Sequence, residues 1–295
     1  MKSKTHILHS DDSCNQKCIF CVKSKDGENK PKKFKGSVMN ESEKDAILRV
    51  YPKSRELSGG LFDENVENWI KKGSYIAISW SGGKDSCLLL KRALDERFNV
   101  KFLFNLVDKK EGISISPPFN SELMILQAKS LCIPLIQVDI SENPRNEFRK
   151  FLVKIKRRGI EGIGVSYIDP KGQREFVREM AEKAGLSVFE PFCGKDREEL
   201  IEEVINGGIR AAIISIDSSR VDQRILGRVI DRKMVEFLKK SGGIDLCGEN
   251  GEFQTLVLDC PIFKNKISVE DYELITDGSF YHLYIKRAKL IEKNI

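Results

Sequence analysis

The chain has 295 residues, of which 40% are hydrophobic and 32% charged, and its 50 basic and 44 acidic residues give a net charge of +6. This ordinary apolar content excludes a chain that is disordered throughout, and the length suits one large or two ordinary domains. No run approaches the roughly 18 consecutive apolar residues that a membrane span needs. We therefore expect a globular protein with no membrane partner.

The N-terminal residues MKSKTHILHSDDS contain no apolar block long enough for a secretory signal, so a cytoplasmic location is expected. Thiols stay reduced in that compartment, where clustered cysteines are more often metal ligands or catalytic groups than disulfides. The chain has eight cysteines, and three of them, Cys14, Cys18 and Cys21, lie within eight residues. The spacing of these three matters more than the total number.

These three cysteines form a C-x3-C-x2-C pattern that resembles the cluster loop of radical S-adenosylmethionine enzymes. Those enzymes need a β/α barrel of their own, and only about 50 irregular residues follow here, so radical chemistry is not expected. Two metals fit the pattern: a [4Fe-4S] cluster with one open iron, or Zn²⁺ with His9 or His6 as fourth ligand. The third possibility is that the cysteines bind no metal.

Residues 1–72 are polar and irregular, which suggests a small N-terminal metal-binding module and linker. Six lysines and two acidic residues fall within residues 22–37. Such a basic strip could contact the phosphates of a nucleic acid, or it could be a solvated linker.

Residues 73–217 show a regular alternation of apolar strands and helical patterns. Strands are predicted at 75–80, 100–107, 134–139, 161–166 and 210–216. Helices are predicted at 86–97, 120–131, 145–158, 172–185 and 195–206. This order predicts an α/β fold with a doubly wound, mostly parallel sheet, in which ligands bind at the carboxyl ends of the strands.

Residues 218–295 lose this alternation, and we expect a C-terminal α+β subdomain that holds the substrate. A long helix is predicted over 223–240, ended by Gly242 and Gly243. Strands are expected at 254–259 and 280–285.

The strongest single feature is the segment 81–86, which ends a strand and opens a helix. Its glycines allow a tight turn close to a phosphate, and the first-turn amides of the helix point at the anion. A lysine can neutralise phosphate charge, two serine hydroxyls can donate hydrogen bonds, and an aspartate can help to hold Mg²⁺ or brace the loop. These residues are Ser81, Gly82, Gly83, Lys84, Asp85 and Ser86.

The letters SGGKDS after a strand resemble the PP-loop of the ATP pyrophosphatase superfamily, a HUP-like fold. The resemblance implies cleavage of ATP between the α and β phosphates and transfer of the adenylyl group to an oxygen of the substrate. It also implies ATP and Mg²⁺ as ligands and Gly164 as part of the nucleotide site.

A second motif, GENGEFQT at 248–255 followed by LVLDCP, resembles the GEGGEYETLVLDAP signature of diphthine–ammonia ligase-like proteins. Glu249 and Glu252 lie three residues apart in a glycine-rich loop and are expected to be exposed enough to meet a cation, an amine or magnesium. Thr255 could anchor the loop at the start of the strand. The alternative is a tight hairpin with solvated glutamates.

The two motifs and the segments between them cover about residues 74–270, and the resemblance implies a mechanism. A substrate carboxylate attacks the α-phosphate, and ammonia then displaces AMP to leave an amide. The acceptor would be diphthine, the modified histidine of translation elongation factor 2. The resemblance places Lys84, Asp85, Glu249 and Glu252 in catalysis, and it assigns Gln173, Arg174, Gly248, Asn250, Gly251 and Thr255 to the substrate.

The sequence departs from the family's pattern at several positions that would be expected to recognise the acceptor. Gln173 and Arg174 keep only part of a Tyr-Gln-Arg-x-Arg segment, residues 114–120 lack an expected histidine, and Phe253 and Gln254 replace Tyr and Glu. A second function therefore stays open: a tRNA sulfur transferase that adenylates a base carbonyl and receives sulfur from the cysteine cluster. A weaker third is a regulatory protein that binds ATP without turnover. A homodimer is possible for each of them.

Overall fold

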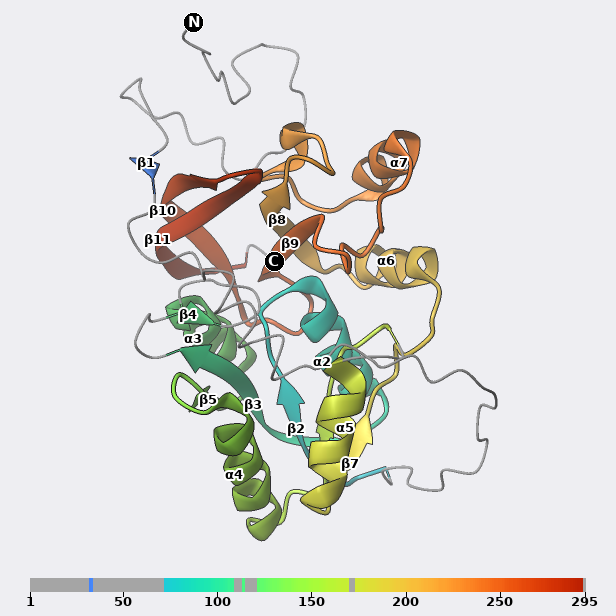
Figure 1. The fold of residues 1–295 in the computed structure, drawn as a ribbon, viewed down its shortest axis with the longest axis vertical. Helices are drawn as coiled ribbons and strands as arrows, with labels where there is room; N and C mark the ends of the chain where they lie inside the picture. Colours follow the sequence, from blue (N-terminus) through green and yellow to red (C-terminus); the bar gives the residue numbers. More distant parts are fainter. Residues whose placement is uncertain (1–31, 34–71, 109–112, 115–120, 170–172, 294–295) are drawn as a thin grey trace, which may run out of the picture. The chain divides into compact units, whose positions relative to one another are not determined.

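The computed structural model describes residues 32–33, 72–108, 113–114, 121–169 and 173–293 (Figure 1). Within this part the chain forms two compact units. The first contains residues 72–196 and 262–264, and the second contains residues 32–33, 197–261 and 265–293. Helix α6 (Arg197–Asn206) and strand β8 (Arg210–Asp217), which the sequence groups with the nucleotide domain of residues 73–217, belong to the second unit. In the described residues, no helix is both long and apolar enough to cross a membrane.

The first unit is built on a parallel sheet with the strand order β5-β3-β2-β6-β7. Its strands are β2 (Tyr75–Ser79), β3 (Asn99–Asp108), β5 (Leu135–Asp139), β6 (Gly162–Gly164) and β7 (Ser187–Phe189), and the short β4 (Ile113–Ser114) pairs antiparallel with β3. Strand order reverses between β2 and β6, because successive strands are added on one side of β2 and then on the other. That reversal is where open α/β sheets bind ligands.

Four helices connect these strands: α2 (Lys84–Asp95), α3 (Ser121–Leu131), α4 (Pro144–Arg157) and α5 (Gln173–Lys183). Helix α4 starts sharply because Pro144 suits the first helical position and the Asn143 side chain accepts a hydrogen bond from the backbone N–H of Asn146. Its apolar residues recur at helical spacing and enter a core cluster with β3, β6 and α5. This cluster includes Phe104, Phe148, Phe151, Leu152, Ile155, Ile163 and Val177. The predicted doubly wound α/β architecture is confirmed.

The second unit has a sheet with the strand order β1-β10-β11-β8-β9. Its strands are β1 (Lys32–Lys33), β8 (Arg210–Asp217), β9 (Phe253–Asp259), β10 (Asn265–Asp277) and β11 (Phe280–Glu292), with α6 (Arg197–Asn206), α7 (Arg232–Ser241) and the 3-10 turn η1 (Gln223–Ile225) between them. Strands β8 to β11 pair antiparallel, and β1 pairs parallel with β10. The expectation that 210–216 joins the parallel sheet is therefore wrong. The predicted strands include neither β7 nor β10.

The predicted continuous helix over 223–240 is also wrong. The N–H of Gly227, whose φ is +79°, donates to the carbonyl of Ile213 on β8 at 2.7 Å, and the N–H of Ile213 donates to the Arg228 carbonyl at 2.8 Å. Pairing with β8 therefore interrupts the helical pattern. The helix α7 begins only after Asp231, whose side chain accepts from the N–H of Met234 at 2.8 Å.

His282 lies on β11, opposite Ile275 of β10 and Ser215 of β8, and its ring stacks on Phe280. Burial lowers the pKa of the imidazole, and the charge of Asp277 opposes this only in part. The histidine is thus a strand residue that is uncharged at neutral pH.

Replacing this residue, His282→Gln, should flatten the dependence of stability on pH. The unfolded chain takes up a proton near pH 6.5 while the folded one resists it, so wild-type stability falls as the pH drops through that value, by at most about 1.4 kcal/mol per pH unit. Urea unfolding at pH 7.5, 6.5 and 5.5 measures the difference between the two proteins. Parallel stability curves would contradict a neutral, half-buried His282.

Candidate functional site

The loop 81–86 follows β2 at the reversal of strand order, where the sequence analysis places a phosphate. Gly83 is the N-cap of α2, and a glycine has no side chain that could cap the helix. The first-turn amides and the positive end of the helix dipole thus face the position of an incoming anion. The arrangement has the chemistry of a phosphate cradle.

The two serine hydroxyls brace the loop from inside. Ser86 donates to the Gly83 carbonyl at 3.0 Å and also accepts from Ser81 at 3.2 Å, and the N–H of Gly83 donates to Ser81 at 3.4 Å. Ser86 is only 1% exposed. In the structure both hydroxyls bond within the loop, and their donation to a phosphate stays a prediction.

Lys84 is almost completely buried at 3% exposure, and its Nζ lies 2.8 Å from Oδ2 of Asp85. The aspartate, by contrast, is only partly buried. The contact with Lys84 braces the loop, and the role of Asp85 toward Mg²⁺ stays a prediction. The pair also holds the lysine charge inside the loop.

A buried glutamine on α3, which sequence reasoning missed, fixes the start of the loop. Gln127 accepts a hydrogen bond from the indole N–H of Trp80 at 2.8 Å and donates to the carbonyl of Gly82 at 2.9 Å. Asn105 on β3 donates to the carbonyl of Trp80 at 2.9 Å. The one available signal was a glutamine on the apolar face of the 120–131 helical pattern, between Met124 and Leu131.

Gly82 lies directly against this support. Its φ is +80°, and a Cβ there would approach Met124 to 2.5 Å and Gln127 to 2.7 Å. A side chain at position 82 would therefore have to displace the ends of these two side chains and adopt a φ that favours glycine.

The carboxyl ends of β6 and β7 add a second group of residues to this edge of the sheet. Gly164 ends β6, and a Cβ on it would meet the Ile78 side chain at 2.5 Å. Arg174 in the first turn of α5 donates from Nε and Nη2 to the two carboxylate oxygens of Glu190, at 2.7 and 2.6 Å, and Arg178 lies 3.5 Å from the same carboxylate. Both partners of the bidentate pair are largely buried, and sequence reasoning missed Glu190.

Cys193 lies near this pair. Burial raises the pKa of its thiol, against the opposing effect of the Arg174 charge. A neutral thiol is a poor nucleophile, so this cysteine is not activated for nucleophilic attack at neutral pH.

The second motif belongs to the other unit, where it forms a turn before β9. Glu252 is buried at 3% exposure, and its carboxylate accepts from the N–H of Asp245 at 3.1 Å and from the N–H and side-chain amide of Asn250 at 3.1 and 3.3 Å. The expectation that Glu252 is exposed is wrong, because the loop folds around its carboxylate. Glu249 is exposed, as expected.

The remaining motif residues hold this turn in place. Gly248 has φ +74°, and a Cβ on it would meet the Phe253 carbonyl at 2.7 Å. Thr255 is buried on β9 opposite Ile213, while Asn250 and Gly251 are exposed. Cys247 and Cys260, the two cysteines that flank the motif, are both buried.

The metal-ligand predictions lie outside the described residues. Cys14, Cys18 and Cys21 fall there, together with His6, His9 and the side chain of Gln173. Among the residues that the structure does describe, no group of three or more His, Cys, Asp or Glu could hold a metal ion.

Comparisons with known proteins cover both units. The model of the diphthamide synthase N-terminal domain matches residues 74–188, and that of the diphthamide synthase C-terminal domain matches residues 196–291. The two ranges together span well over half of the chain.

Curated relatives extend over most of the same region. A human diphthine–ammonia ligase is 29% identical over 228 residues, which cover 68% of this chain and 84% of the relative. The Bos taurus diphthine–ammonia ligase is 28% identical over 231 residues, covering 69% and 86%. A solved structure, a predicted subunit of tRNA methyltransferase from Methanocaldococcus jannaschii, covers 63% of this chain at 15% identity and a TM-score of 0.37, which supports no functional argument.

The close approach of α3 to the loop predicts that Gly82→Ala weakens ATP binding by at least tenfold. The added methyl group must displace Met124 or Gln127 and therefore moves the loop. Gly159→Ala is the matched control, since Gly159 has a similar φ of +85° and nothing within 4 Å of the added Cβ. Both variants should lose about 1 kcal/mol of stability from positive φ. Calorimetric titration with ATP separates them, and equal affinities would contradict the steric argument.

Proposed function

The chain belongs to the diphthamide synthase family, and from this premise we propose that it is an ATP-dependent ligase that converts diphthine and ammonia into the amide. The observation that carries the proposal is the match of both family domains to a chain whose SGGKDS loop lies at the strand-order reversal. The acceptor is then a diphthine side chain on translation elongation factor 2.

The reaction has two steps. A carboxylate oxygen of diphthine attacks the α-phosphorus of ATP, the bond to the β-phosphate breaks, and pyrophosphate leaves. Ammonia then attacks the acyl carbon, loses a proton and expels AMP. The chain contributes alignment and charge neutralisation, through the amides at the start of α2 and through Lys84.

Magnesium enters this proposal with the phosphates of ATP. Mg²⁺ is usually held by one or two carboxylates together with phosphate oxygens. It therefore does not need a group of three or more protein ligands, and none is found among the described residues. Asp85 is the carboxylate of the loop and would be the protein ligand.

Arg174 is the group that we assign to the carboxylate of the acceptor. A guanidinium recognises carboxylates by paired hydrogen bonds. The two hydrogen bonds to Glu190 fix the orientation of the Arg174 guanidinium. Glu190 is thus a positioning residue.

Exposed Glu249 and buried Glu252 take different parts in this proposal. Glu249 is exposed on the turn, so we assign its carboxylate to the ammonia or to a cation. Glu252 shapes the turn that carries it, together with Gly248, Asn250, Gly251 and Thr255.

The competing interpretation, sulfur transfer to tRNA, gains no support from the curated relatives reported above, which are named for amidation. A metal at Cys14, Cys18 and Cys21 stays a prediction from their spacing, as [4Fe-4S] or as zinc. The cytoplasmic location and the homodimer also stay predictions from the sequence.

Incubation of the full chain with ATP, magnesium, ammonia and diphthine-bearing elongation factor should yield AMP, pyrophosphate and the amide in equal amounts. Mass spectrometry of the modified histidine detects the amide, and an elongation factor without diphthine is the control. ADP as the product would exclude the proposed cleavage of ATP. AMP formed only with tRNA and sulfide would exclude diphthine as the acceptor.

Glu190→Gln should raise the KM for the elongation factor roughly tenfold and leave the KM for ATP within twofold, because the amide keeps the size but loses one charged hydrogen bond worth about 1.5 kcal/mol or more. Glu182→Gln is the control, since Glu182 pairs with Arg178 on the exposed surface of α5. A uniform loss of kcat with an unchanged KM would contradict a positioning role.

A further inference from the structure

The positive charge of the chain is concentrated on one helix. Residues 145–158 contain seven basic residues and one acidic residue, so the net charge of this segment equals the +6 of the whole chain. The rest of the chain is electrically balanced. Helix α4 and the residue that follows it are therefore a strongly basic segment, as is the strip 22–37 of the N-terminal part.

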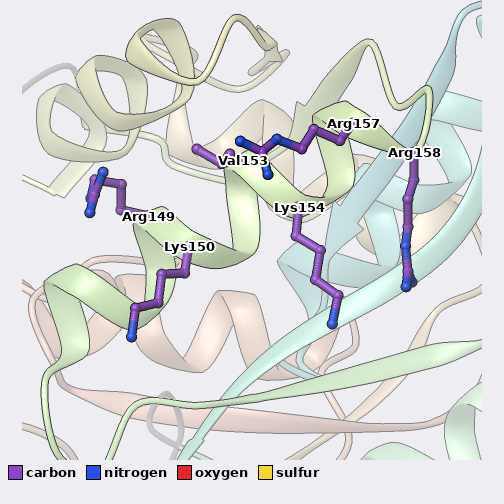
Figure 2. A pocket seen from close by; sticks show the side chains of 6 residues that line it. All are labelled: Arg149, Lys150, Val153, Lys154, Arg157 and Arg158. Carbon is purple, nitrogen blue, oxygen red and sulfur yellow. The ribbon is translucent and has the colours of Figure 1, made fainter.

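Five of these basic side chains line a hollow on the exposed side of α4 (Figure 2). The sixth lining residue is Val153, and no acidic residue takes part. Lys150, Lys154 and Arg158 follow one another at intervals of four residues and extend to the same side of the helix. The lining residues are Arg149, Lys150, Val153, Lys154, Arg157 and Arg158.

Little acidic charge within the described residues offsets this face. Lys150 pairs with Glu147 at 2.8 Å, and Arg149 donates to the side chain of Asn146 at 3.2 Å. No ion pair to a described residue is found for Lys154, Arg157 or Arg158. All five basic side chains are exposed.

Helix stability does not explain the pattern. Cations in the last turn of a helix offset its dipole, which accounts for Lys154 and Arg157. Lys150 lies mid-helix, however, and like charges four residues apart each cost about 0.2–0.5 kcal/mol. The face thus holds a repulsion that an anionic ligand would relieve.

The opposite side of α4 holds the helix rigidly. Phe148, Phe151, Leu152 and Ile155 are all buried in the core cluster of the first unit. The basic face is therefore preorganised on a fixed helix, and its residues can be exchanged without disturbing the core.

We propose that this face of α4 binds the phosphate backbone of a nucleic acid. Arginines and lysines at regular intervals on one helix face are the electrostatic footprint of such binding. An acidic protein surface fits less well, because protein interfaces have an apolar and aromatic centre and only Val153 is apolar here. The lack of aromatic lining residues also excludes base stacking, so the contacts are to phosphates and independent of sequence.

The position on the helix makes this site distinct from that of ATP. Helix α4 follows β5 and runs from the carboxyl edge of the parallel sheet, where the loop 81–86 lies, to the opposite edge. Arg157 and Arg158 lie at that far end. Nucleic acid on this face leaves the affinity for ATP unchanged.

The test measures binding of the full chain to a fluorescent RNA duplex, a DNA duplex of the same sequence and poly-glutamate of equal charge, between 50 and 200 mM salt. The variant Lys154→Glu/Arg157→Glu/Arg158→Glu should bind the duplexes at least tenfold more weakly, and the slope of log K against log salt should become shallower by about 2 to 3. The relative affinity for RNA and DNA identifies the source of the phosphates.

The control variant, Lys233→Glu/Lys240→Glu/Lys264→Glu, changes three exposed lysines elsewhere and the net charge equally. The control variant should bind the duplexes with an affinity within about twofold of that of the wild type. Both variants should keep the ATP affinity and the melting temperature of the wild type. Equal weakening in the two variants would overturn the proposal, because the effect would then be one of net charge. Poly-glutamate bound as tightly as RNA would also overturn it, in favour of an acidic protein partner.

Discussion

The site in the first unit depends on how closely the loop after β2 can pass beneath α3. The backbone turns at Gly82 within contact distance of Met124 and Gln127, and the glutamine holds both this turn and Trp80 by hydrogen bonds. The loop position is thereby set by packing and by buried polar contacts together. The start of α2, and with it the direction of the amides and of Lys84, follows from that position.

Much of this was predictable because the signals are local. Four strands of the parallel sheet, the helices α2 to α5, the glycines of the loop and the start of α2 can each be recognised in a short window of sequence. Gln127 and Glu190 could not be recognised in this way. Their roles arise from contacts with residues 45 and 16 positions away, which the pattern of a single sequence does not encode.

The second unit shows the other limit of local signals. The residues 223–240 have helical periodicity, but pairing of Gly227 and Val229 with β8 outweighs it and delays the helix to Arg232. Likewise, Glu252 is charged and flanked by glycine, which predicts exposure. Its three hydrogen bonds to the turn make burial favourable, because a buried carboxylate is tolerated once donors surround it.

In the absence of a ligand, the ion pair between Lys84 and Asp85 neutralises the charge of the lysine within the loop. Any ligand that recruits the lysine competes with a carboxylate that is covalently tethered one residue away and never diffuses off. A monovalent anion such as chloride or acetate competes weakly with this carboxylate for Lys84. A triphosphate competes better, because it carries several negative charges and a metal ion that can bind the displaced aspartate. The loop therefore discriminates by valence before any part of the nucleoside is recognised.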